Sequence, residues 1–163
     1  MTEEINKRDP FATTLESVTR SIAGCAKGKE AISEVVGAAA REAVDSGGDL
    51  APAAKAILMG VVRGTGETGE AALQLLSQAA RIVIRQTADR SGNLAAAIKG
   101  IVLGAIASAK AIGVETAKAA STAAQGAVEG AGEAGSVTVE RVRGALKEPI
   151  GGNKVVLPAP LAT

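Results

Sequence analysis

The sequence predicts an all-α protein of long antiparallel helices built from repeats of about 44 residues. The first observation is internal similarity: residues 44–51 resemble residues 88–95, and residues 55–60 resemble residues 99–104. The second is composition, because 35 Ala and 20 Gly make up a third of the 163 residues, and strands are depleted in both. The third is that both copies carry a helix stop and cap, Gly-Gly-Asp-Leu and Ser-Gly-Asn-Leu. Repeats of this length are typical of stacked helical units.

The helical domain is expected over residues 10–148, after a charged and flexible tail at residues 1–9. Asp9 and Pro10 fit an N-cap and a first helical position, where the missing N–H of proline has no consequence. Apolar residues then recur at helical spacing, which predicts two helical stretches. They are Leu15, Val18, Ile22 and Cys25, and then Ile32, Val35, Val36, Ala39 and Val44.

The turn at residues 46–49 is expected to end one helix and to begin the next, with Asp49 as its cap and Pro52 in its first turn. A helical stripe follows on both sides of the glycine-rich segment 64–69. Three glycines in six residues, each costing about 1 kcal/mol in a helix interior, favour a bend or a tightly packed crossing there. The pattern leaves open whether one helix crosses the segment or two helices meet.

The second half repeats the scheme. Gly92 and Asn93 stop one helix and cap another, and residues 94–129 have helical composition without proline. The glycine cluster at residues 130–136 closes this arm. A short final helix is expected before Pro149, and residues 149–163 are expected to form an extended or disordered tail.

The composition argues against an enzyme. The chain has no His, which removes the commonest general base and metal ligand. Its one Cys, Cys25, lies among small apolar residues and is interpreted as a buried small side chain. The carboxylates are scattered, and the Gly-x-Gly-x-x-Gly match at residues 64–69 lacks the preceding strand that a dinucleotide site needs. We therefore expect no catalytic, metal or cofactor-binding residues and no cofactor.

The charge pattern does not predict nucleic-acid binding, since 18 basic and 17 acidic residues are mixed along the chain. The longest uncharged run in the most apolar segment, residues 100–109, is too short to span a bilayer. That segment is nonetheless apolar on two sides, with Leu103 and Ile106 beside Lys99 and Lys110, and such a helix favours two neighbours or a neighbour and a lipid surface. Because the N-terminus has no apolar signal region, a cytoplasmic location is expected.

Glycines four residues apart are the most consistent motif, at 24 and 28, 60 and 64, 100 and 104, and 126 and 130. This spacing aligns them on one helix face, where two backbones can approach closely. The predicted helix-packing interface consists of Gly60, Gly64, Gly100, Gly104, Ile57, Ile101 and Ala105.

The repeated caps, each followed by a Lys-small-Ile-x-x-Gly element, resemble a group of Ala- and Gly-rich repetitive bacterial proteins over residues 18–147. That resemblance implies helical repeats and no particular activity. The chain is more loosely similar to phasins, the Ala-rich helical proteins that coat polyester granules. We therefore expect a structural, self-associating protein that forms homo-oligomers. The alternative is amphipathic coating of a membrane or a hydrophobic inclusion.

Overall fold

The computed structural model describes residues 10–24 and 29–147, which form seven α-helices and no strand. The helices are α2 (Pro10–Gly24), α3 (Lys29–Asp45), α4 (Leu50–Thr65), α5 (Gly69–Asp89), α6 (Leu94–Ile112), α7 (Thr116–Ala134) and α8 (Ser136–Leu146). The all-α prediction is therefore confirmed. The two predicted tails, the Asp9 cap, Cys25 and Gly28 lie outside the described residues.

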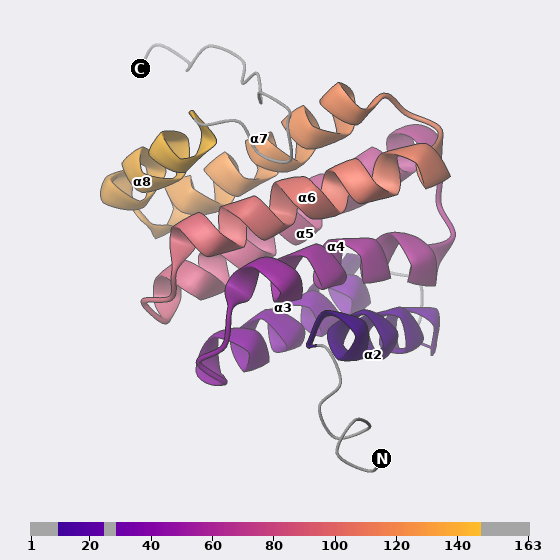
Figure 1. Cartoon of the computed structure of the whole chain (residues 1–163), viewed down its shortest axis with the longest axis horizontal. Helices are drawn as coiled ribbons and strands as arrows, with labels where there is room; N and C mark the ends of the chain where they lie inside the picture. Colours follow the sequence, from indigo (N-terminus) through magenta and orange to yellow (C-terminus); the bar gives the residue numbers. More distant parts are fainter. Residues whose placement is uncertain (1–9, 25–28, 148–163) are drawn as a thin grey trace.

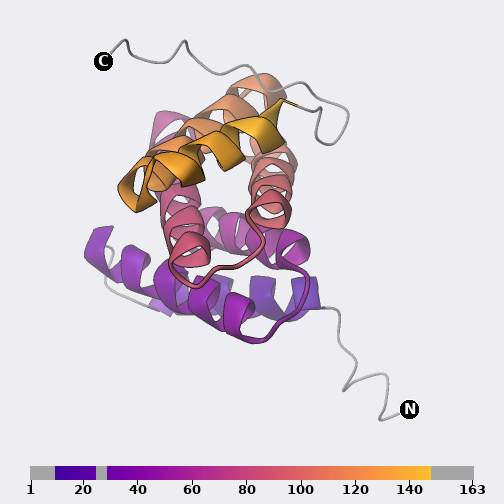
Figure 2. The ribbon, with the colours of Figure 1, turned by 90° about the vertical axis from the view of Figure 1, so that its left-hand side faces the viewer.

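The helices form two layers. In the front layer of Figure 1, α2 packs on α4 and α4 packs on α6. In the back layer, α3 packs on α5 and α5 packs on α7. Figure 2 views the layers from their edge and shows α8 at the opposite end of the stack from α2 and α3, against both α6 and α7. Successive helices from α2 to α7 therefore alternate between the layers.

The predicted caps form at the two repeated turns. Asp49 accepts a hydrogen bond from the Ala51 N–H at 3.0 Å, and Asn93 accepts one from the Ala96 N–H at 3.1 Å. Each side chain satisfies one of the backbone donors that a helix N-terminus leaves free. Short polar side chains thus set the starts of α4 and α6 locally.

The glycine-rich segment 64–69 is a turn between two helices. Gly66 adopts the left-handed conformation, with φ of 70°, and its N–H donates to Val62 O at the end of α4. The preceding element is a helix, so the context of a dinucleotide-binding loop is absent at this segment.

Residues 94–129, which have helical composition throughout, belong to two helices, α6 and α7, with a turn at Gly113 between them. Gly113 adopts a left-handed conformation, with φ of 77°, and its N–H bonds to the last carbonyls of α6. A single glycine in a strongly helical composition is compatible with either a cap or a helix interior. The chain turns there because α7 packs in the other layer, a choice that local propensity does not make.

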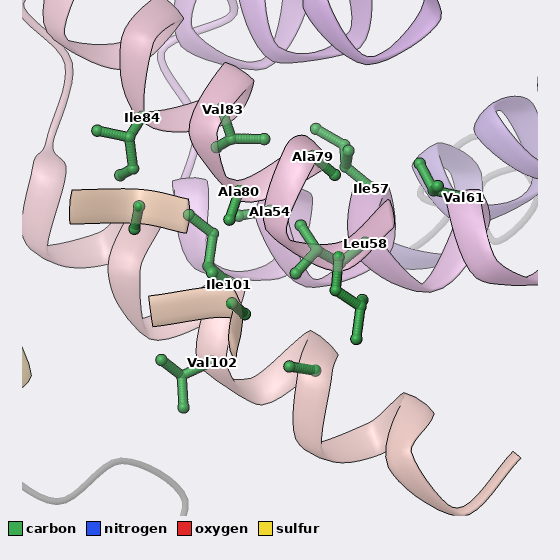
Figure 3. Close-up of a cluster of buried hydrophobic side chains, with 14 of the residues drawn as sticks. Ala54, Ile57, Leu58, Val61, Ala79, Ala80, Val83, Ile84, Ile101 and Val102 are labelled. Atoms are coloured by element: carbon green, nitrogen blue, oxygen red, sulfur yellow. The ribbon is translucent and has the colours of Figure 1, made fainter. Parts of the chain in front are cut away.

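The core lies between the layers and consists of small and branched apolar side chains (Figure 3). Ile57 and Leu58 of α4, Ile84 of α5, and Ile101 and Val102 of α6 are each at most 1 % exposed. Alanines such as Ala54 and Ala80 fill the places between them. A core without bulky aromatic side chains requires close approach of the helices, because each alanine fills little volume.

Candidate functional site

Every glycine of the predicted interface lies against a neighbouring helix. A Cβ added at Gly60 would lie 2.8 Å from Val18 Cβ, and one added at Gly64 would lie 2.6 Å from Ile22 Cβ, both on α2. On α6, a Cβ added at Gly104 would lie 2.9 Å from the Lys55 carbonyl oxygen. Real side chains do not tolerate such distances, so the backbones of these helices are closer than any larger residue permits.

Gly100 has the tightest surroundings of the four predicted glycines. A Cβ at this position would overlap the carbonyl oxygen of Ala51 and would lie 2.8 Å from Ala54 Cβ. The contact is with the backbone of α4, which cannot rotate away as a long side chain can. The α4–α6 contact therefore depends on the absence of a side chain at residue 100.

The three larger predicted interface residues belong to the core beside these glycines. Ile57 is 1 % exposed, and Ile101 and Ala105 are fully buried. The predicted residues therefore divide between two contacts, because Gly60 and Gly64 of α4 face α2 whereas Gly100 and Gly104 of α6 face α4. All of these contacts are made inside one chain, so an association between two copies has to use other surfaces.

Two further glycines, absent from the predicted interface, pack in the same way in the back layer. A Cβ at Gly126 or Gly130 of α7 would overlap the carbonyl oxygens of Ser77 and Arg81, respectively, on α5. Their spacing was visible in the sequence, but it did not reveal the partner helix.

Gly24 does not have the packing role that its spacing predicts, because a Cβ added there would meet nothing within 4 Å. Gly24 is the last residue of α2 and is exposed.

The fold sorts the charges that are mixed along the sequence. Helices α2, α4 and α6 contain five basic residues and one acidic residue, whereas α3, α5 and α7 contain five basic and eight acidic residues. In the back layer several of these charges pair across α5 and α7: Arg85 lies 3.4 Å and Arg81 3.6 Å from Glu133, and Lys118 lies 3.7 Å from Glu70. The front layer instead carries an excess of positive charge.

The front face of α6 combines charge and apolar surface. Lys99 and Lys110 are exposed, and Leu103 and Ile106 lie half-buried between them. By length and composition alone, α6 passes the test for a helix able to cross a membrane, although more than half of its most apolar window is buried in the fold. A helix buried in a protein core can have the same length and apolar composition, and the inner side of α6 contacts the core.

The described residues contain no cluster of three or more Cys, Asp or Glu side chains arranged to hold a metal ion. Comparison with known protein families, curated proteins and solved structures gave no match for this chain.

Proposed function

We propose that this protein is a non-catalytic structural protein, a stack of repeated two-helix units that associates with further copies of itself. The repeated unit is a helix of the back layer followed, in antiparallel direction, by a helix of the front layer. Two matched helix boundaries support this repeated unit. Helices α3 and α5 end at Asp45 and Asp89, which are 44 residues apart. Helices α4 and α6 begin at Leu50 and Leu94, which are also 44 residues apart. Stacked units of this kind bury apolar faces that no single unit buries alone.

The observation that supports the stacked architecture in this proposal is the recurrent glycine pair. Three separate helix contacts, α2–α4, α4–α6 and α5–α7, each have two glycines four residues apart against the backbone or Cβ atoms of the neighbour. Dispersion over long, close contacts replaces the burial of large side chains. The glycine pairs thus allow close packing of neighbouring helices, and such packing is what a stacked structural protein requires.

Sedimentation velocity of the full-length protein over a wide concentration range tests the proposal. We expect the weight-average mass to rise with concentration above that of the monomer. A monomer at every concentration would refute self-association.

A second function, coating of an anionic lipid surface, is favoured by the front face of the molecule. Helices α4 and α6 contain four basic residues and no carboxylate, namely Lys55, Arg63, Lys99 and Lys110. Each lysine or arginine near an anionic membrane contributes about 1 kcal/mol of attraction. Leu103 and Ile106 offer apolar contact between two of these cations.

Flotation with vesicles of phosphatidylglycerol or of phosphatidylcholine tests this second function. Binding only to the anionic vesicles, weakened by combining Lys99→Glu with Lys110→Glu, would support it. A back-layer control is Lys118→Glu, which reverses an exposed cation on α7 that lies 3.7 Å from Glu70. Failure of the wild-type protein to float with anionic vesicles would exclude coating.

A further inference from the structure

A groove lies at the end of the stack between α2 and α3, with a volume of about 630 Å³. Hydroxyl side chains of α2 form one wall, and small apolar residues and carboxylates of α3 form the other. The start of α4 closes it. Its lining residues are Thr13, Thr14, Ser17, Val18, Ser21, Glu34, Val35, Ala38, Ala39, Glu42, Ala43, Ser46, Gly48, Asp49, Pro52 and Ala53.

The groove occupies the place of a helix in the stack. In the back layer, Gly126 and Gly130 of α7 receive the backbone of α5. The residues 88 positions earlier are Ala38 and Glu42 of α3, and both line the groove. The face of α3 that corresponds to the packing face of α7 therefore has no described helix against it, while α5 covers another side of α3.

The groove is negatively charged. Glu34, Glu42 and Asp49 line it, and its lining contains no Lys or Arg. None of the three forms an ion pair with any residue in the described ranges. A helix that fits here should carry basic residues together with a small or apolar contact face.

Helix α8, at the other end of the stack, has these properties. Val137 is 63 % exposed and is the one large hydrophobic side chain in the described ranges with such exposure. Arg141 is exposed and forms no ion pair there, and a Cβ at Gly144 would meet nothing within 4 Å. Residues spaced by four and three positions share one helix face, so these three groups form a single surface, with the exposed Glu140 at its edge.

The lengths also agree. The 11 residues of α8 span roughly 16 Å at 1.5 Å per residue, and the groove wall from Glu34 to Ala43 spans roughly 14 Å. We propose that α8 of one copy docks in the α2–α3 groove of a second copy, with Val137 against the alanines of α3 and Arg141 beside Glu34 and Glu42. This inference rests on the proposed self-association and names the surfaces that form it.

The two surfaces lie at opposite ends of the stack (Figures 1 and 2), so the contact is head-to-tail. A head-to-tail contact that does not close into a ring adds copies without limit. Since both partners carry opposite and unpaired charge, the association should weaken as ionic strength rises.

Charge exchange in the full-length protein tests the assignment. Arg141→Glu and Glu42→Arg should each weaken association about tenfold or more, measured by sedimentation velocity from about 5 µM to about 500 µM. An equimolar mixture of the two variants should associate again, because the unchanged groove of the Arg141→Glu variant can receive the unchanged α8 of the Glu42→Arg variant. Glu42 and Arg141 are both exposed, so circular dichroism should show an unchanged fold.

The matched control is Arg63→Glu on α4, an exposed charge away from both surfaces, which should associate like the wild-type protein. Association that neither Arg141→Glu nor Glu42→Arg reduces would overturn the α8–groove contact and leave the proposed self-association standing. A mixture that stays monomeric would likewise overturn the pairing of these two surfaces. A wild-type protein that is monomeric throughout would overturn the proposed function together with this contact.

Discussion

Replacement of Gly100 by alanine tests the packing argument at its tightest point. The added Cβ would overlap the Ala51 carbonyl oxygen and would lie 2.8 Å from Ala54 Cβ, whereas carbon atoms in contact prefer about 3.5–4.0 Å. Helices α4 and α6 must separate, and overpacking of this kind costs about 1–3 kcal/mol. Because the obstacle is backbone, we take the upper value, about 3 kcal/mol. The better helix propensity of alanine returns about 1 kcal/mol, which leaves a net loss of about 2 kcal/mol.

The same change at Gly144 provides a control of opposite sign. Gly144 lies 44 residues after Gly100, in α8, but a Cβ there meets nothing within 4 Å. Only the propensity gain remains, so Gly144→Ala should stabilise the protein by about 0.5–1 kcal/mol. For a chain of this size, 1 kcal/mol shifts the Tm by about 2–4 °C. Thermal unfolding followed by circular dichroism at low protein concentration should therefore show Gly100→Ala melting about 4–8 °C lower, and Gly144→Ala slightly higher, than the wild type. A Gly100→Ala variant that melts at or above the wild-type temperature would refute the reasoning.

Three further predictions concern the caps and the core, and urea titration of the free energy of unfolding checks each of them. Asp49→Ala removes the acceptor of the Ala51 N–H and should destabilise the protein by about 1 kcal/mol, whereas Asp49→Asn should have little effect; equal losses in both variants would contradict a capping role. Ser91 has a φ of 57°, a left-handed conformation that is unfavourable for a side chain by about 1–2 kcal/mol, so Ser91→Gly should stabilise the turn; a loss of stability would show that the serine side chain is needed. Ile101 is fully buried, and Ile101→Ala should cost about 2–5 kcal/mol against about 0.5–1.5 kcal/mol for Ile101→Val. Similar small losses in both Ile101 variants would mean that the core relaxes around the cavity.

Local chemistry made part of the fold predictable. The starts of α4 and α6 follow from Asp49 and Asn93, whose short side chains bond to backbone N–H groups two and three residues away. The core face of α6 was also predictable, because Ile101 and Ala105 share a buried stripe. The break at Gly113 was not, since a glycine within an alanine-rich stretch fits a helix interior as well as a cap.

The candidate site, too, was predictable only in part from the sequence. The spacing of Gly60 with Gly64 and of Gly100 with Gly104 predicted close helix contacts, but not which helix each pair would face. Val137 lies on the face of α8 opposite Val142 and Leu146, and it is exposed while those two are buried. Whether an apolar residue is covered depends on the neighbours that tertiary packing supplies.

By itself, the sequence determined that the chain is helical and where α4 and α6 begin, because capping and propensity act within a few residues. The tertiary structure decided which helices pair and where charge accumulates. Successive helices from α2 to α7 alternate between two layers, so basic and acidic residues that are mixed along the chain separate onto different faces. It also left the acidic groove between α2 and α3 and the exposed face of α8 at opposite ends of the stack. These features join residues far apart in sequence, and local interactions alone cannot specify them.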